Sequence, residues 1–118
     1  MKKVLLFAGL TMLLAGCGRS TSDWIAQLQA KDSSDRLHAV RALKDSRSDK
    51  EEVVAALMTA LKDGDAFVRR DAARALGKLG PDAVEASSSL RSLAVKDRNV
   101  QVRKAAKEAL QQIEEPRL

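Results

Sequence analysis

Apolar residues recur every three or four positions between Asp65 and Gly80 (DAFVRRDAARALGKLG), which is the spacing of one buried helix face. The residues of this stripe are Val68, Ala72, Ala75, Leu76 and Leu79. The Asp65 carboxylate suits a helix N-cap, and Gly80 followed by Pro81 ends a helix because proline cannot continue it. The pattern predicts a helix over residues 65–79 that buries an alanine-rich face against neighbours.

The same pattern occurs three times in one register, at intervals of 33 and then 34 residues. The matched positions are Arg36, Arg69 and Arg103; Ala39, Ala72 and Ala106; and Leu43, Leu76 and Leu110. A Lys-Asp pair precedes each copy, at residues 31–32, 62–63 and 96–97. A fixed period in this range is typical of stacked supersecondary units, so we predict a repeat protein.

A further apolar segment precedes each repeated helix and supplies its partner. The predicted helices cover residues 23–30, 34–44, 51–62, 65–79, 81–95 and 100–114, and the repeats run over about 23–45, 51–79 and 81–114. No stretch alternates apolar and polar residues with period two, so we predict no strand. The predicted fold class is all-α: an α-solenoid of about three helix pairs, in a domain over residues 23–118 that follows a cleaved signal peptide.

The first and third pairs depart from the pattern. Asp32 and Arg36 lie four positions apart, whereas the matched residues of the later repeats lie six apart. Terminal repeats are often atypical because one face meets water, and we interpret Trp24 as covering this end of the core. The alternative is an exposed aromatic residue that binds a partner. Ser87-Ser88-Ser89 makes the helix at 81–95 the least apolar, and we expect it to be the least stable.

The first 17 residues carry a pattern of a different kind. Met1-Lys2-Lys3 is basic, and the apolar run over residues 4–15 is far shorter than the ~20 residues of a membrane-spanning helix. It predicts a secretory signal peptide over residues 1–16. Leu14-Ala15-Gly16-Cys17 resembles the lipobox of bacterial lipoproteins. The resemblance implies that diacylglycerol alkylates Cys17, that acyl chains such as palmitate anchor the mature chain, and that residues 17–22 form a lipidated tether.

The resemblance to a lipobox also implies a cellular location. We expect export and lipid anchoring at the periplasmic face of a bacterial membrane, and Gly18 in place of an aspartate weakly favours the outer membrane. The alternative is an ordinary signal with a stray or buried thiol. Cys17 is the only cysteine, so no intramolecular disulfide can form. Cleavage removes the two charges of Lys2 and Lys3 and lowers the formal charge from +5 to +3. Because an exported protein rarely meets nucleic acid, we expect no nucleic-acid partner.

The helix pairs resemble HEAT repeats, most of all the short variety named after phycobilisome lyases. The resemblance is carried by residues 62–80 (KDGDAFVRRDAARALGKLG), 80–83 and 96–110. In that family an aspartate in the turn within a repeat and an arginine early in its second helix link successive repeats. The residues that match these positions are Asp63, Arg69, Asp97 and Arg103, whereas Asp32 and Arg36 match only with the shorter loop.

The lyase name invites an enzymatic interpretation that the residues do not support, because a fold does not carry a function. His38 is the only histidine and lacks metal-ligand spacing, so we interpret it as an exposed or half-buried helix residue. Gly77 and Gly80 are interpreted as helix-end residues and not as a phosphate loop. We predict no enzymatic activity, catalytic residue, metal, cofactor or small-molecule substrate.

Positive charge on the second helices is the remaining feature. Six residues fall outside the apolar stripe: Arg41, Arg70, Arg74, Lys78, Lys104 and Lys107. In HEAT stacks the second helices line the concave face, so the resemblance implies a weakly basic groove for an acidic partner, interrupted by Asp71 and Glu108. The alternative is an ordinary solvated face.

Three functional hypotheses follow from these features. The first is a membrane-anchored scaffold that binds an envelope protein. The second is a module that binds anionic lipid headgroups or lipopolysaccharide through its basic helix face, and the third is a lyase-like enzyme. Salt dependence separates the first two, because headgroup binding through lysine and arginine is strongly screened by salt.

Overall fold

The computed structural model describes residues 18–46 and 49–115 of this 118-residue chain. The predicted signal peptide and Cys17 lie outside the described residues, so cleavage and lipidation stay predictions. The elements are α2 (Thr21–Gln27), α3 (Ser33–Lys44), α4 (Lys50–Ala60), α5 (Ala66–Leu79), the 3₁₀ helix η1 (Gly80–Ala86), α6 (Ser87–Lys96) and α7 (Val100–Glu114). The described residues contain no strand, which confirms the all-α class over that part of the chain.

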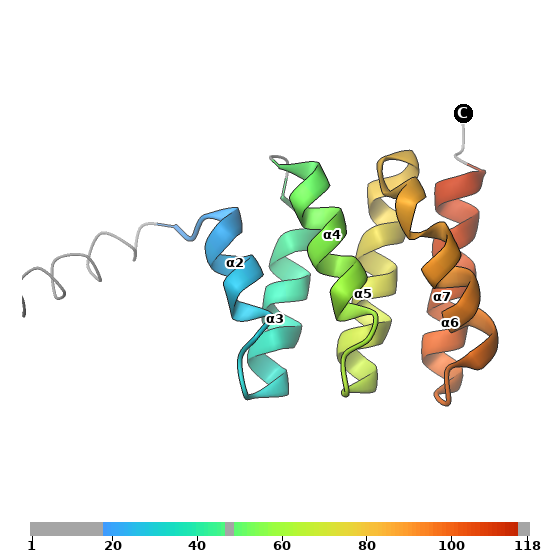
Figure 1. Ribbon diagram of the computed structural model, residues 1–118, viewed down its shortest axis with the longest axis horizontal. Coiled ribbons are helices and arrows are strands. Elements are labelled where there is room, and N and C mark those ends of the chain that lie inside the picture. The colour runs from blue at the N-terminus through green and yellow to red at the C-terminus, as the bar shows by residue number, and fades with distance from the viewer. Residues whose placement is uncertain (1–17, 47–48, 116–118) are drawn as a thin grey trace, which may run out of the picture.

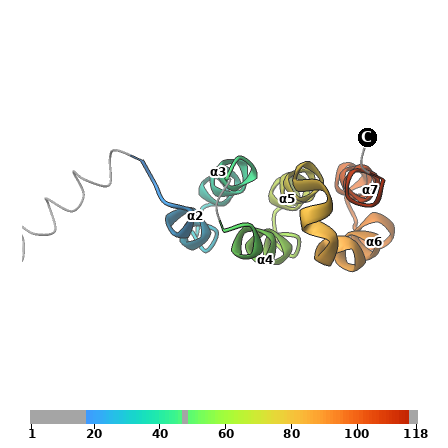
Figure 2. The same cartoon turned by 90° about the horizontal axis from the view of Figure 1, so that it is seen from above.

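The helices form pairs that lie side by side along one direction (Figure 1). Seen from above, α3, α5 and α7 form one row, and α2, α4 and η1–α6 form the other (Figure 2). The molecule is elongated, at 56 × 32 × 17 Å. Because α5 packs against both α3 and α7, the middle pair carries the contacts that join the stack.

The alanine-rich stripe of α5 is buried. Val68, Ala72, Ala75 and Leu76 are fully inaccessible, and they belong to one core that continues through all the helix pairs. Gly77 lies in this packed interface: a Cβ added there would lie 2.8 Å from the Ala109 Cα. Gly77 lies in the last turn of α5, as interpreted, and its missing side chain also permits α5 and α7 to approach.

The predicted Asp65 cap is confirmed, and Asn99 forms a second cap of the same kind. The Asp65 carboxylate accepts hydrogen bonds from the backbone N–H groups of Phe67 and Val68, at 2.7 and 3.4 Å. The Asn99 side chain accepts in the same way at the start of α7, at 2.8 and 3.2 Å. Each cap satisfies backbone donors that the first turn of a helix leaves free.

The first helix begins earlier than predicted. Ser20 caps α2, because its hydroxyl accepts from the Asp23 N–H while the Asp23 carboxylate accepts from the Ser20 N–H, a reciprocal capping box. Thr21 and Ser22, which we assigned to the tether, therefore belong to α2. The helix also ends at Gln27 and not at Ala30.

Residues 81–95 do not form the single helix that we predicted. Pro81 does lie in the first turn of a helical segment, but that segment is η1, and the non-helical backbone of Ala83 (φ −100°, ψ 20°) kinks it in its middle. Gly80, at φ 64°, turns the chain at the end of α5. The short 3₁₀ segment then carries Ala83 and Ala86 into the core before α6 begins at Ser87.

Trp24 lies at the N-terminal end of the stack. It is half-buried and packs against the core, as expected for a residue that covers this end. Its ring stacks on that of His38, with centroids 5.3 Å apart, and the Arg19 guanidinium lies 4.9 Å from the Trp24 centroid. His38 is exposed, in agreement with the prediction of an ordinary helix residue.

Candidate functional site: charged networks on two faces

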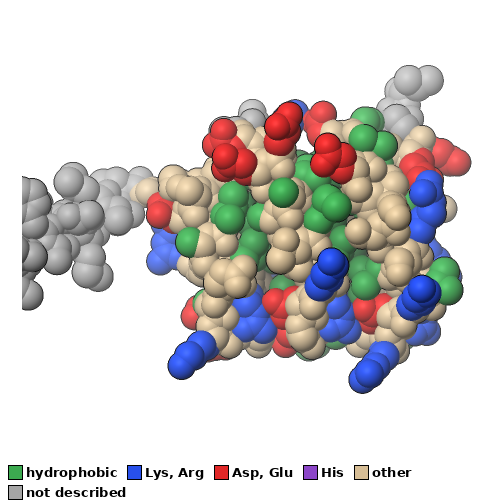
Figure 3. All heavy atoms as spheres, viewed as in Figure 1, with side chains coloured by type: hydrophobic (Ala, Val, Ile, Leu, Met, Phe, Trp, Pro, Cys, Tyr) green, Lys and Arg blue, Asp and Glu red, His purple; other side chains and the backbone are tan. Residues whose placement is uncertain are grey.

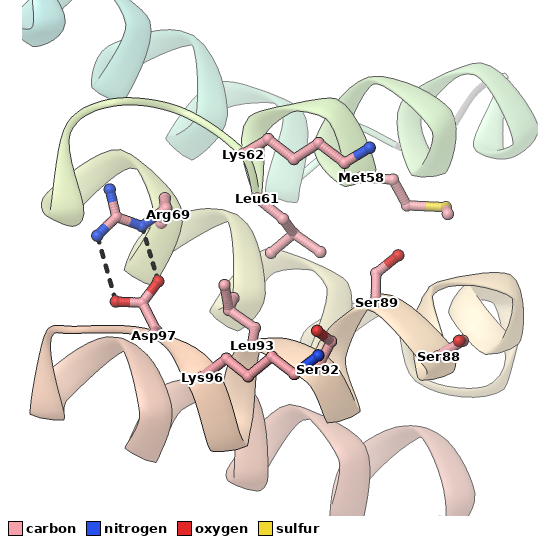
Figure 4. A pocket seen from close by; sticks show the side chains of 10 residues that line it. All are labelled: Met58, Leu61, Lys62, Arg69, Ser88, Ser89, Ser92, Leu93, Lys96 and Asp97. Carbon is pink, nitrogen blue, oxygen red and sulfur yellow. Dashed lines mark hydrogen bonds and ion pairs between the residues drawn. The ribbon is translucent and has the colours of Figure 1, made fainter.

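Two arginines reach from one helix pair to an aspartate of the next. The Arg36 Nε lies 2.8 Å from the Asp63 Oδ2, and its Nη2 lies 3.1 Å from Oδ1. The Arg69 Nε and Nη2 approach the Asp97 carboxylate in the same way, at 2.9 and 3.2 Å (Figure 4). Arg36 thus forms the same two-bond fork as Arg69 in spite of its shorter loop.

The same residues also fix the turn within each pair. Arg69 donates to the Asp63 carbonyl at 2.8 Å, and Arg103 donates to the Asp97 carbonyl at 2.7 Å. Arg36, Asp63, Arg69, Asp97 and Arg103 therefore form a continuous chain of contacts, which we name the turn ladder. Among the described residues, Arg103 donates hydrogen bonds only to main-chain carbonyls, those of Asp97 and Arg98.

The ladder keeps its aspartates ionised. Burial raises the pKa of the Asp97 carboxyl. Hydrogen bonds from the Arg69 guanidinium and the Asn99 N–H lower it by more, so the pKa lies below its usual value. For Asp63, too, burial raises the pKa, but the hydrogen bonds from Arg36 outweigh this effect and the pKa lies below its usual value. Only 5% of the Asp97 side chain is exposed, so its charge depends on these partners.

A second network lies between α3 and α5. The Asp71 carboxylate, 10% exposed, is 2.8 Å from the Arg41 Nε, 3.0 Å from the Arg70 Nε and 3.7 Å from the Arg74 Nη1. Burial raises the pKa of Asp71, but hydrogen bonds from Arg41 and Arg70 lower it to below its usual value. We name these four residues the Asp71 cluster. It lines a groove of about 360 Å³.

The predicted basic face is divided in the structure. Arg41 and Arg74 are more than half exposed in the groove, whereas Arg70 is turned inward, 20% exposed, with its guanidinium 5.1 Å from the Phe67 ring centroid. Lys78 lies across the same two helices, 3.5 Å from the Asp45 carboxylate. Lys104 and Lys107 are exposed on α7 and do not line this groove.

Sequence reasoning missed the role of Asp71, which it treated as an interruption of a basic stripe. The signal was its position, three residues after Val68 and four before Ala75, which places it at the edge of the buried stripe. A carboxylate at such a position needs cationic partners. The matched positions in the other repeats hold His38 and Ala105, so the repeat pattern did not reveal it.

Residues 18–46 and 49–115 lack two features that would indicate other kinds of site. That part of the chain contains no group of three His, Cys, Asp or Glu residues arranged to hold a metal ion. None of its helices combines the length and the apolar character that crossing a membrane requires.

Helix pairs stacked in two rows and joined by arginine–aspartate contacts define an α-helical repeat protein. The family model of HEAT repeats matches residues 21–111, which is most of the chain. The chain belongs to the HEAT-repeat family. Members of this family are typically non-catalytic and commonly act as protein-interaction scaffolds. A comparison with curated proteins gave no significant match.

Proposed function

We propose that this protein is a scaffold that holds an acidic partner protein at a bacterial membrane. Family membership supports the scaffold, because HEAT repeats commonly bind proteins. The lipobox-like sequence over residues 14–17 supports the anchor, with lipidation of Cys17 and exposure of the helical domain in the cell envelope, the outer membrane being slightly favoured. The partner is a second envelope protein, and no nucleic acid or small-molecule substrate is involved.

The observation that carries the proposal is the Asp71 cluster. The groove lining contains four cationic side chains and two carboxylates, which leaves two uncompensated positive charges. Asp71 holds Arg41 and Arg74 in place while most of each side chain stays exposed. Because a pre-organised guanidinium loses little conformational freedom on binding, such a groove suits a carboxylate of a partner protein.

The test is crosslinking of the full chain in cells, followed by identification of the captured proteins. We expect Arg41→Gln/Arg74→Gln to lose the partner, because Arg70 still satisfies Asp71 and the fold survives. The matched control is Lys104→Gln/Lys107→Gln, which removes the same charge from an exposed helix outside the groove. Equal capture by both double variants at equal melting temperature would reject the Asp71 cluster as the binding site.

Charge reversal at Arg70 is not a suitable test, although its place among the basic residues makes it an obvious choice. Arg70 is mostly buried against Asp71, so a glutamate there would place two carboxylates together and destabilise the fold. Binding and folding effects could then not be separated.

The anchor requires its own test. Cys17→Ala should block maturation and leave a larger precursor that incorporates no labelled palmitate. A variant that matures, labels and fractionates like the parent chain would show that the lipobox interpretation is wrong.

Headgroup binding through the basic helix face is the alternative. It predicts that the Arg41→Gln/Arg74→Gln chain loses affinity for phosphatidylglycerol vesicles, steeply dependent on salt. The scaffold proposal predicts equal vesicle affinity for that variant and the parent chain.

A further inference from the structure

A second groove lies in the other row of helices, between α4 and α6 (Figure 4). Its volume of about 490 Å³ falls in the range that ligand sites occupy, roughly 300–1,000 Å³. Leu61, directly after α4, and Leu93 of α6 point toward one another and form its floor with Met58. The remaining lining residues are Lys62, Arg69, Ser88, Ser89, Ser92, Lys96 and Asp97. We name this the outer groove.

Small side chains keep the outer groove open. Ser88, Ser89 and Ser92 of α6 occupy little volume where larger residues would fill the space toward α4. None of the described residues forms a hydrogen bond with the hydroxyl groups of these serines, so each can donate to a ligand and accept from it. The groove therefore combines an apolar floor with free polar groups.

The rim of the outer groove is positively charged. Lys62 and Lys96 are the lysines of two matched Lys-Asp pairs, and their side chains run along α4 and α6 on either side of the floor (Figure 4). Neither lysine forms an ion pair with any residue that the structure describes. Asp97 is the only carboxylate in the lining, and Arg69 binds both of its oxygens.

The turn ladder explains why these lysines are left unpaired. Each lysine precedes an aspartate in sequence, but Asp63 and Asp97 turn to the arginine of the preceding repeat. On the face that carries α2, α4 and α6, lysine and arginine lie along the edge of these turns with carboxylates between them, whereas the opposite edge shows mainly aspartate and glutamate (Figure 3). The outer groove opens beside the basic edge.

We propose that the outer groove binds a segment of a partner protein in which acidic residues flank one apolar side chain. The carboxylates pair with Lys62 and Lys96, and the apolar side chain covers Leu61, Leu93 and Met58. This inference rests on the proposed scaffold function and names the partner segment. A lipid acyl chain fits less well, because the floor consists of three side chains with a cation on each side, and most of a long chain would stay in water.

The test is fluorescence anisotropy on the full chain in non-ionic detergent. The probe is a short labelled peptide with glutamates on both sides of one leucine; one comparison peptide replaces glutamate by glutamine, and another replaces leucine by glycine. We expect Lys62→Gln/Lys96→Gln to weaken binding of the probe roughly tenfold, as the loss of two rim ion pairs implies. Both comparison peptides should bind more weakly than the probe to the parent chain.

The repeat itself supplies a matched control. Lys31 is the third lysine of the Lys-Asp series, is exposed, and does not line the outer groove, so Lys31→Gln should leave binding unchanged. Ser92→Phe, which fills the groove without changing charge, should also abolish binding. Unchanged melting temperatures would show that these variants fold.

Several results would overturn the inference. The first is failure of the probe peptide to bind the parent chain. The second is a loss of peptide binding by Lys31→Gln equal to that of Lys62→Gln/Lys96→Gln. The third is a loss of peptide binding by Arg41→Gln/Arg74→Gln but not by the outer-groove variants. Binding of phosphatidylglycerol vesicles that needs Lys62 and Lys96, without peptide binding, would assign the groove to lipid. If the peptide does not bind the outer groove but an envelope protein is still captured through the Asp71 cluster, only the inference about the outer groove is rejected. If no protein is captured, the proposed scaffold function is rejected as well.

Discussion

Removal of the Arg69 guanidinium should destabilise the protein by far more than removal of its repeat counterpart Arg103. Arg69→Met keeps the apolar stem but deletes two bonds to Asp97 and one to the Asp63 carbonyl. The Asp97 carboxylate, 5% exposed, is then left with the Asn99 N–H and the more distant Arg103. Breaking a buried pair costs ~3–5 kcal/mol, and the remaining donors reduce the expected loss to ~2–4 kcal/mol.

Arg103→Met is the matched control, because it removes the same group at the same repeat position. Arg103 donates to the Asp97 and Arg98 carbonyls, at 2.7 and 3.2 Å, and has no carboxylate partner among the described residues. Its loss should therefore cost only ~1–2 kcal/mol, in line with two neutral acceptors. Adding Asp97→Asn to Arg69→Met should recover part of the loss, because no charge is then left buried without its partner.

Urea unfolding of the full chain, followed by circular dichroism, measures these differences. Acid adds an independent readout: because the folded state lowers the pKa of Asp97, its stabilising contribution is present above ~3.9 and is lost as pH falls through the folded-state pKa. Stability should therefore fall less steeply below about pH 4 in Asp97→Asn than in the parent chain. Equal losses for Arg69→Met and Arg103→Met, without recovery by Asp97→Asn, would refute the reasoning.

Three further predictions concern packing. Gly77→Ala should lower the free energy of unfolding in urea by ~1–3 kcal/mol, because the new Cβ meets Ala109. Gly64→Ala is the control, because nothing lies within 4 Å of a Cβ there, and it should change little. Equal effects would contradict the close approach of α5 and α7. Ser87→Ala should leave the melting temperature unchanged or raise it, because no described residue bonds the buried Ser87 hydroxyl, and a clear decrease would reveal a missed partner. Trp24→Ala should accelerate hydrogen exchange in α2 and α3 but not in α7; uniform acceleration would contradict its end-cap role.

Much of the fold could be predicted because local signals and the repeat agreed. In α5 the apolar spacing, the Asp65 cap and the Gly80-Pro81 stop all mark the same helix, and the structure places its ends there. At α2 the signals were weaker, since the capping box of Ser20 ends in aspartate and not in the usual glutamate or glutamine. For residues 81–95 no residue of the sequence marked a break within the predicted helix, and only the backbone shows the kink at Ala83.

The two charged networks differ in how far the sequence could reveal them. Residues of the turn ladder recur in one register, so that Asp63, Arg69 and Asp97 could be selected before any geometry was known. The Asp71 cluster occurs once, and its partner Arg41 lies 30 positions away on another helix. Because Asp71 has no counterpart in the other repeats, comparing the repeats could not identify it. Its partner also depends on how α3 and α5 pack, which the sequence does not show.

The positive charge at the rim of the outer groove also could not be predicted from the sequence alone. Lys62-Asp63 and Lys96-Asp97 are neutral pairs in sequence, and counting charges along the chain would cancel them. In the fold the aspartate of each pair bonds an arginine of the preceding repeat, while the side chains of Lys62 and Lys96 extend along α4 and α6. Because the ladder separates neighbours in this way, each repeat that donates an aspartate to it also leaves one lysine free. The contacts that join the stack therefore produce the positive rim that a partner segment can use.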